Sequence, residues 1–269
     1  MNYEEILIIK VGGGKQINWD YICRDIAGLK EKVILVHGAN WQMEEISKKL
    51  GQKTKMITSP SGYTSRYTDK QTLGALTMVY SGLVNKQIVA KLQALGINAV
   101  GLSGIDGRIW EGEWKKVVLS KEGGKVKAIR DNFQGRVTKV NDKLLKLLLE
   151  NNYLPVLTIP AISFENQLIN VDNDRAIAVM AKALDIKKLV VLFEASGLLK
   201  DTRDQKSIIK NIQANKIEDY LKYAQGRMKK KILGAKEAVQ AGVKIIYWAD
   251  GRVNNPIKKA LKGKGTVIK

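Results

Sequence analysis

The chain of 269 residues is long enough to bury a sizeable core, and its hydrophobic content of 45% excludes a disordered polypeptide. Its 46 lysines and arginines against 26 acidic residues give a net charge of +20, which favours a polyanionic partner: nucleic acid, an anionic membrane or an acidic protein. One cysteine excludes an internal disulfide, and no apolar run reaches the roughly 20 residues that a membrane span needs. We therefore expect a cytoplasmic protein without a membrane anchor. A lysine-rich solvated surface without any such partner is the alternative.

Strand-like and helix-like segments alternate along the chain, which predicts an α/β fold with a mainly parallel open sheet sandwiched by helices. The predicted strands are Glu5–Val11, Val33–His37, Asn98–Leu102, Leu154–Ile159, Lys188–Phe193 and Val243–Trp248. The predicted helices are Trp19–Lys30, Trp41–Leu50, Thr68–Leu95, Asp142–Asn151, Asp172–Leu184, Ile217–Tyr223, Lys229–Ala241 and Pro256–Leu261. Residues 55–65 suit a hairpin and residues 107–136 a β-rich excursion. No low-complexity linker divides the chain, so we expect a single domain of two closely packed lobes.

The first predicted strand delivers Lys10 to its end, and Gly12 and Gly13 follow almost at once. Glycines let backbone N–H groups approach an anion closely, and the lysine adds a positive charge at the same place. The spacing is not that of a P-loop. The segment predicts a phosphate-binding turn, with a plain strand-to-helix turn as the alternative.

The second predicted strand ends in His37, Gly38, Ala39 and Asn40, which lead into a helix. Backbone amides and a helix N-terminus again meet at the carboxyl end of a strand, where ligands of open parallel sheets gather. His37 is the only histidine, and neither a nucleophile elbow nor a metal-ligand cluster accompanies it. We interpret His37 as a structural residue that closes the turn.

Three later segments carry further polar groups. Arg66 precedes a helix and can reach a carboxylate with its planar guanidinium. Residues 168–174 place several polar side chains where a strand passes into a helix. Residues 226–231 begin a helix with basic side chains near its positive end, which is unfavourable unless an anion binds there. A solvated lysine cluster is the alternative for this last segment.

In this order the motifs resemble those of the amino acid kinase family over essentially the whole chain. The residues that match the family's motifs are Lys10, Gly12 and Gly13; His37, Gly38, Ala39 and Asn40; Arg66, Thr68 and Asp69; Asn170, Asp172 and Asp174; and Met228 and Lys231. Any one of these motifs is weak evidence. Five in the family's order are strong evidence.

Within the family the chain is similar to the N-acetylglutamate kinase branch, and most to the kinase of carrier-mediated lysine and arginine biosynthesis. Residues 62–73, 101–108 and 224–231 carry this similarity. In that pathway α-aminoadipate or glutamate is attached through its amino group to a small acidic carrier protein. The resemblance therefore implies ATP-dependent phosphorylation of the carried side-chain carboxylate, and it gives the positive charge a partner of opposite sign.

The resemblance also implies roles for individual residues. Lys10 would lie on the transferring phosphoryl group, Lys231 on the leaving side, and Asp174 would hold both lysines in position. The acceptor would be bound by residues of the 1–170 lobe: Gly38, Ala39, Asn40, Arg66 and Asn170. The nucleotide would be bound mainly by the 171–269 lobe, with contacts from Gly12, Gly13, Phe193, Glu194, Ser196, Gly197, Leu198 and Met228. Mg²⁺ would arrive with ATP, and the enzyme would be a homodimer joined through the acceptor lobe.

The chain departs from the family pattern at two places. Ala39 and Asn40 stand where the family has further glycines, so we expect their side chains to narrow the acceptor site or change its polarity. Phe193 and Glu194 stand where the nucleotide loop usually begins T/S-D. Two alternatives remain open: a kinase acting on free N-acetylglutamate, and a catalytically weakened member of the fold that binds nucleic acid.

Overall fold

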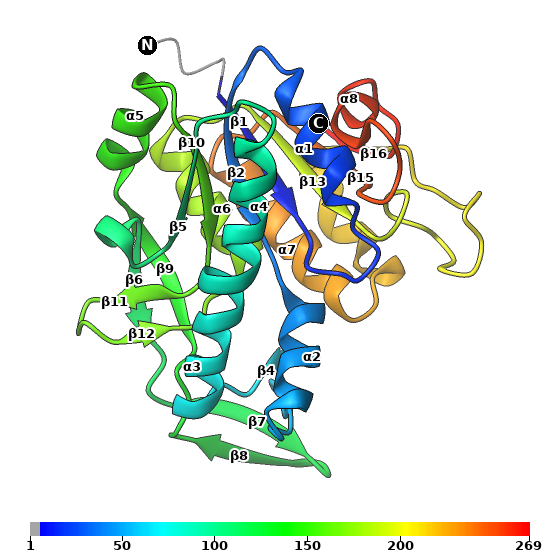
Figure 1. Cartoon of the computed structure of the whole chain (residues 1–269). Coiled ribbons are helices and arrows are strands. Elements are labelled where there is room, and N and C mark those ends of the chain that lie inside the picture. The colour runs from blue at the N-terminus through cyan, green and yellow to red at the C-terminus, as the bar shows by residue number, and fades with distance from the viewer. Residues whose placement is uncertain (1–5) are drawn as a thin grey trace.

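A computed structural model describes residues 6–269, and its centre is an eight-stranded sheet (Figure 1). In spatial order the strands are β14 (Asn211–Ile212), β16 (Thr266–Ile268), β15 (Ile245–Asp250), β13 (Lys188–Phe193), β1 (Ile6–Val11), β2 (Lys32–His37), β10 (Leu154–Thr158) and β5 (Ala99–Ser103). All neighbours are parallel except β15 and β16. The expected α/β fold with a mainly parallel sheet is confirmed.

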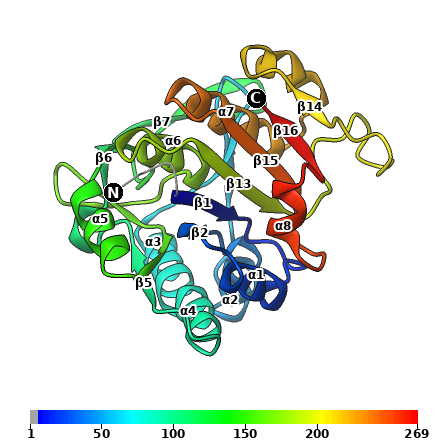
Figure 2. The ribbon, with the colours of Figure 1, turned by 90° about the horizontal axis from the view of Figure 1, so that it is seen from above.

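Helices cover both faces of this sheet (Figure 2). One face carries α6 (Asn173–Ala183) and α7 (Arg227–Gln240), which pack against each other. The opposite face carries α1 (Trp19–Ala27), α4 (Asn85–Gln93) and α8 (Pro256–Leu261), while α2 (Asn40–Lys49) follows β2 and α5 (Asp142–Glu150) contacts β10. Strands covered on both sides read as continuous apolar runs, which is why β1 and β13 could be found from sequence.

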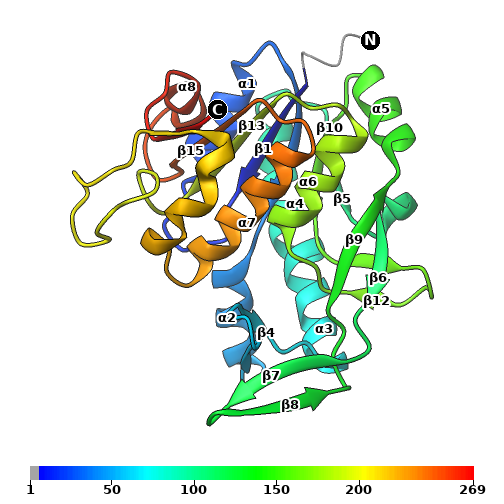
Figure 3. The ribbon, with the colours of Figure 1, turned by 180° about the vertical axis from the view of Figure 1, so that it is seen from behind.

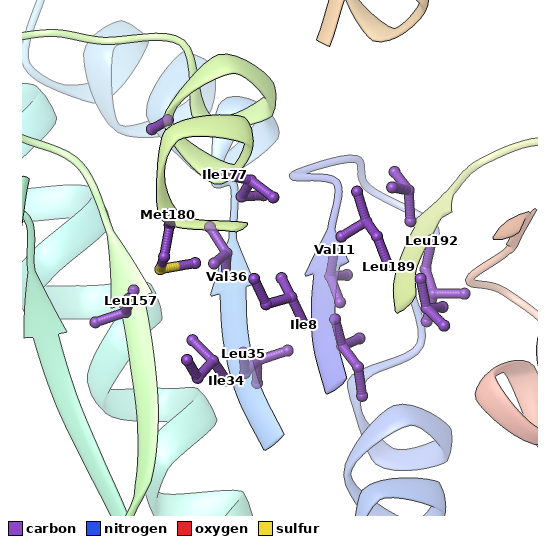
Figure 4. Close-up of a cluster of buried hydrophobic side chains, with 14 of the residues drawn as sticks. Ile8, Val11, Ile34, Leu35, Val36, Leu157, Ile177, Met180, Leu189 and Leu192 are labelled. Carbon is purple, nitrogen blue, oxygen red and sulfur yellow. The ribbon is translucent and has the colours of Figure 1, made fainter. Parts of the chain in front are cut away.

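The hydrophobic core fills both faces of the sheet, and one part of it lies between the sheet and α6. Figure 4 shows Ile177 and Met180 of α6 lying over strands that carry Ile8, Val36 and Leu157, and all five side chains are buried. Apolar residues at positions i and i+3 of a helix share one face, so α6 presents a single apolar stripe to the sheet. This packing fixes the N-terminus of α6 above the end of β1.

Smaller sheets extend beyond the main one at the end where α2 and α3 (Lys70–Thr77) lie (Figure 3). They comprise the four-stranded sheet β12 (Leu168–Ile169), β11 (Ala161–Ser163), β6 (Trp110–Trp114) and β9 (Gly135–Val140), the hairpin β3 (Met56–Thr58) with β4 (Thr64–Arg66), and the hairpin β7 (Val118–Glu122) with β8 (Lys125–Ile129). The predicted hairpin at residues 55–65 and the β-rich excursion at 107–136 are therefore present.

Several predicted boundaries differ from the structure. The first helix ends at Ala27, where the Gly28 N–H bonds to the Asp25 and Ile26 carbonyls. Residues 214–223 form a 3-10 helix rather than an α-helix. The predicted helix Thr68–Leu95 is continuous, but residues 78–84 adopt a π-helical conformation between α3 and α4. The short strands β11, β14 and β16 were not predicted, and Glu5 lies outside the described residues.

No helix within residues 6–269 is both long and apolar enough to cross a bilayer.

Candidate active site

The loops after β1 and β2 meet at the carboxyl edge of the sheet. A side chain at Gly13 would place its Cβ 2.3 Å from the Ala39 amide nitrogen and 2.4 Å from that of Asn40, so only glycine permits this approach. The Trp41 N–H donates to the Gly13 carbonyl at 2.8 Å. The Gly12 N–H is already engaged with the Leu192 carbonyl at 2.8 Å, whereas the Gly13 N–H has no hydrogen bond within residues 6–269. Gly13 is thus the glycine of the pair whose amide is available to an anion.

Two lysines share one carboxylate above these loops. The Nζ of Lys10 lies 2.8 Å from Oδ1 of Asp174, and the Nζ of Lys231 lies 3.5 Å from Oδ2. All three side chains are at least four-fifths buried. Lys231 also lies 5.3 Å above the centre of the Phe193 ring, within the range of a cation–π contact. Two cations on one anion leave an unbalanced positive charge, which suits a polyphosphate.

Burial and mutual charge shift the pKa values of this trio in different directions. Burial acts to lower the pKa of Lys10, but the adjacent Asp174 carboxylate outweighs it and raises the pKa above its ordinary value. Burial acts to raise the pKa of Asp174, and the two lysines hold it well below its usual range. For Lys231, burial and the neighbouring Lys10 outweigh Asp174 and lower the pKa to about 8. Lys10 is therefore firmly charged, while Lys231 can lose its proton under mildly alkaline conditions.

The contact between α6 and α7 places Asp174 and Lys231 together. A Cβ at Gly234 would lie 2.7 Å from Cβ of Asp174, so the missing side chain lets the two helices approach. Asp172 caps α6 by accepting hydrogen bonds from the backbone N–H groups of Asp174 and Arg175. A small cavity below is lined by Asp174, Lys231 and Gly234 together with apolar residues of β13 and β15.

Ala39 and Asn40, the two residues after β2 that depart from the family pattern, have different surroundings. Ala39 is fully buried and packs with the hydrophobic core, and its expected effect on the acceptor site stays a prediction. Asn40 accepts a hydrogen bond from the Tyr80 hydroxyl at 3.1 Å. Burial raises the pKa of Tyr80, and the nearby charges of Arg66, Arg227 and Lys10 oppose the rise. The Tyr80 hydroxyl thus occupies the side-chain oxygen of Asn40.

Arg66 and Asn170 come together through Thr68. The Asn170 side chain donates to the Thr68 hydroxyl at 2.9 Å, and that hydroxyl donates to the Arg66 carbonyl at 3.0 Å. The Arg66 guanidinium bonds the Thr54 hydroxyl at 3.0 Å and lies 3.8 Å from the Glu44 carboxylate. Arg66 therefore already contacts one carboxylate at the edge of the site.

The predicted nucleotide residues follow β13. Glu194 accepts a hydrogen bond from the Gln16 N–H and lies directly against Gly14, so it joins the β13 loop to the β1 loop. The Ser196 hydroxyl donates to Gln205 at 3.3 Å. The Leu198 N–H donates to the Thr266 hydroxyl at 2.8 Å, and a Cβ at Gly197 would contact the same hydroxyl.

Two predicted nucleotide-binding residues remain. Phe193 is buried, and Met228 is partly buried at the start of α7. Phe193 also makes an edge contact with Trp248, with ring centres 6.3 Å apart.

His37 is buried, bonds to polar groups of the scaffold and makes an edge contact with Trp19, with ring centres 6.2 Å apart. Its Nε2 lies 3.2 Å from the Asn85 side-chain nitrogen, and burial lowers its pKa to about 4, so the ring is neutral at pH 7. Its carbonyl accepts hydrogen bonds from Thr158 and from Asn173. These contacts agree with the interpretation of His37 as a residue that closes the turn.

Sequence reasoning missed several residues that support the site, including Asn173, Tyr80 and Gly234. Asn173 lies inside a motif that was identified, and a glycine three positions after Lys231 in a helix is a usable signal because glycine is unfavourable there. Tyr80 carried no such signal, since only the fold brings it to Asn40.

Comparison with known proteins agrees with this geometry. A sequence model of the amino acid kinase family matches residues 5–247, and the chain belongs to that family. The chain is 51% identical over 266 residues to the [LysW]-aminoadipate kinase of Deinococcus radiodurans, covering 98% of this chain and 91% of that protein. It is 46% identical over 269 residues to the [LysW]-aminoadipate kinase of Thermus thermophilus, covering 98% and 100%. A Sulfolobus acidocaldarius relative, named [LysW]-aminoadipate/[LysW]-glutamate kinase, is 33% identical over 98% of this chain and 100% of that protein.

Solved structures share the fold at low identity. The Giardia lamblia carbamate kinase bound to AMP-PNP superimposes with a TM-score of 0.66 at 16% identity, covering 100% of this chain and 99% of that one. The smu.665 protein of Streptococcus mutans gives a TM-score of 0.77 at 20% identity, with 99% of each chain covered. The amino acid kinase fold is thus shown by both sequence and structure.

Proposed function

We propose that the protein transfers the γ-phosphoryl group of ATP to the side-chain carboxylate of α-aminoadipate held on an acidic amino-group carrier protein. One observation carries the phosphoryl-transfer chemistry: Lys10 and Lys231 converge on Asp174 beside the free amide of Gly13. The relatives at 51% and 46% identity, both named [LysW]-aminoadipate kinase, support the acceptor. ATP use accords with membership of the amino acid kinase family. A cytoplasmic location accords with the single cysteine of the chain.

In this proposal a carboxylate oxygen of the acceptor attacks the γ-phosphorus, the bond to the β–γ bridging oxygen breaks, and ADP leaves. The acceptor carboxylate is ionised at neutral pH, so no general base is needed. Lys10 stabilises charge on the transferring group and Lys231 on the leaving oxygen, and Asp174 positions both. Mg²⁺ would enter bound to the phosphates of ATP and neutralise part of their charge.

The acceptor would lie toward Gly38, Asn40, Arg66 and Asn170, and the nucleotide toward residues 193–198 and the start of α7 at Met228. We therefore assign residues 6–170 mainly to the acceptor and 171–269 mainly to the nucleotide. Glutamate on the same carrier is a second acceptor. The Sulfolobus acidocaldarius relative, whose printed name includes both substrates, favours it.

The test is ATP consumption with hydroxylamine trapping of the acyl phosphate. Three acceptors are compared: carrier loaded with aminoadipate, carrier loaded with glutamate, and free N-acetylglutamate. We expect hydroxamate only with loaded carrier, and more with aminoadipate. Turnover of free N-acetylglutamate alone would contradict the carrier-bound acceptor and leave the proposed phosphoryl transfer intact. No ATP use with any of the three acceptors would contradict both proposals.

We also propose a homodimer formed through the acceptor half. Met78 is 57% exposed and Leu83 40% exposed on the π-helical segment, and the open space at Gly82 between them would admit a second helix. Sedimentation equilibrium of the purified protein measures the mass, and a monomer at micromolar concentration would contradict this assignment.

A further inference from the structure

The β7–β8 hairpin, residues 118–129, projects from the acceptor end of the molecule beside β3 and β4 (Figures 1 and 3). Its cross-strand pairs are Leu119 with Ala128 and Lys121 with Val126 on one face, and Ser120 with Lys127 on the other. Side chains alternate between faces along a strand, so the two faces have different neighbours. Ser120 is buried, and β7 contacts β3, so its face is the inner one.

The outer face is apolar and uncovered. Leu119 is 48% exposed and Val126 55% exposed, and Val117, just before β7, is 49% exposed. Monomeric proteins rarely leave large aliphatic side chains grouped in solvent, and such groups mark interaction sites. The face therefore has the composition of a contact surface rather than of a solvated hairpin.

The segment that contains the hairpin is strongly positive. Residues 115–130 contain six cations and one acid, Glu122, which gives a segment charge of +5. Glu122 pairs with Lys127 at 3.0 Å and with Lys55 at 3.7 Å. Within residues 6–269, the segment's remaining cations without an ion pair are Lys115, Lys121, Lys125 and Arg130. Lys121 lies on the outer face itself, and Lys115, Lys125 and Arg130 add positive charge to the segment, so an apolar face in a cationic segment is complementary to an acidic protein.

The hairpin is held firmly at its root, next to the acceptor residues. Asn132, which follows it, accepts a hydrogen bond from the Thr68 N–H at 3.1 Å, and the Phe133 N–H donates to the Thr68 carbonyl at 2.7 Å. Trp114, which precedes it, stacks on Phe133 with ring centres 5.5 Å apart. Because Thr68 also bonds Asn170, the hairpin root and the acceptor contacts form one hydrogen-bonded unit.

We propose that the outer face of the β7–β8 hairpin, formed by Leu119, Val126 and Lys121, is the docking surface for the folded body of the acidic carrier protein. The inference rests on the proposed function for the identity of the partner. The exposed side chains are aliphatic, and bases of single-stranded nucleic acid stack on aromatic rings, so the surface favours a protein. Docking here brings the carried side chain to the end of the molecule where Arg66 and Asn170 lie.

The test uses the whole enzyme and carrier loaded with aminoadipate. The double variant Leu119→Thr/Val126→Thr removes the apolar side chains and keeps residues that suit strands. The variant Lys121→Glu reverses the charge on the outer face. We expect each variant to raise KM for loaded carrier about tenfold with kcat and KM for ATP unchanged, as for truncation of central interface residues. Lys121→Glu should also weaken the salt dependence of KM. Leu147→Gln on α5 and Lys262→Glu after α8 are matched controls, because both remove exposed residues remote from the hairpin.

Thermal melts monitor folding of each variant. Unchanged KM in folded hairpin variants of an active wild type would overturn the docking surface and leave the proposed function intact. If the wild type does not turn over loaded carrier, the proposed function fails, and calorimetric binding of the carrier to wild type and variants still decides the surface. Binding of a duplex DNA that displaces the carrier, and that the same substitutions abolish, would overturn an acidic protein as the occupant.

Discussion

Lys10 and Lys231 are buried at the sheet edge and share one carboxylate, whereas the cations of the β7–β8 hairpin stand in solvent, most of them without an ion pair. Charges in a buried site interact strongly and at fixed distances, while exposed charges are screened within about 10 Å at ordinary salt. The first arrangement suits stabilisation of a transferring phosphoryl group. The second suits attraction and orientation of a partner. Positive charge is therefore arranged in two different ways in this protein.

Substitution of Lys10 by Met should have the largest effect, because it removes a buried charge from the reacting group. We expect kcat to fall about 10²–10³-fold with a smaller change in KM for ATP. Asp174 keeps Lys231 as a partner, so the variant should remain folded, which thermal melting checks. Lys121→Met on the hairpin should instead raise KM for the carrier severalfold. If Lys10→Met changed only KM, Lys10 would have no role in the transition state.

The pH dependence separates the two buried lysines. The pKa of Lys231 is lowered to about 8, so in the free enzyme this lysine loses its charge as pH rises through that value. We therefore expect kcat/KM for ATP to be constant below pH 8 and to fall about tenfold per pH unit above it. In Lys231→Arg the guanidinium stays charged, so the fall should move to higher pH. Lys230→Arg, at the preceding position of α7, should keep the wild-type pH dependence of kcat/KM. An unchanged profile in Lys231→Arg would assign the titration to another group.

The same contrast explains what the sequence could predict. Buried parallel strands are continuous apolar runs, so most strands of the main sheet could be predicted, whereas the grouping of Lys10, Asp174 and Lys231 was implied by the resemblance to the amino acid kinase family. The Lys10–Asp174 ion pair confirms that proximity, although their catalytic roles stay predictions. The docking face of the hairpin could not be predicted from a motif. Which face of a two-stranded sheet is covered depends on its neighbours in the fold, here β3.

Other parts of the site depend on tertiary contacts. Ala39 is fully buried and belongs to the hydrophobic core, which the sequence after His37 did not indicate. Gly12 and Gly13 are equivalent in sequence, yet the Gly12 N–H is used within the fold and that of Gly13 is not. A local pattern identifies which residues surround a ligand site. It does not determine which of their groups are already bonded.

The prediction with the smallest expected effect concerns how α7 positions Lys231. Gly234→Ala places a Cβ 2.7 Å from Cβ of Asp174, so the two helices must move apart. Overpacking of this kind costs about 1–3 kcal/mol, which exceeds the gain of roughly 1 kcal/mol from alanine in a helix. We expect a lower melting temperature and a several-fold lower kcat. Gly74→Ala in α3 is the matched control: nothing lies within 4 Å of its Cβ, so it should stabilise the fold.

The two alanine variants differ only in what the added methyl group meets, so their difference isolates the close approach of α6 and α7. Chemical denaturation measures the free energy of unfolding, and ATP turnover reports on Lys231. A loss of stability with normal kcat would mean that Lys231 reaches its place without that approach. Equal stabilisation by both substitutions would mean that the helices separate freely, and the buried trio would then be no more rigid than the exposed cations of the hairpin.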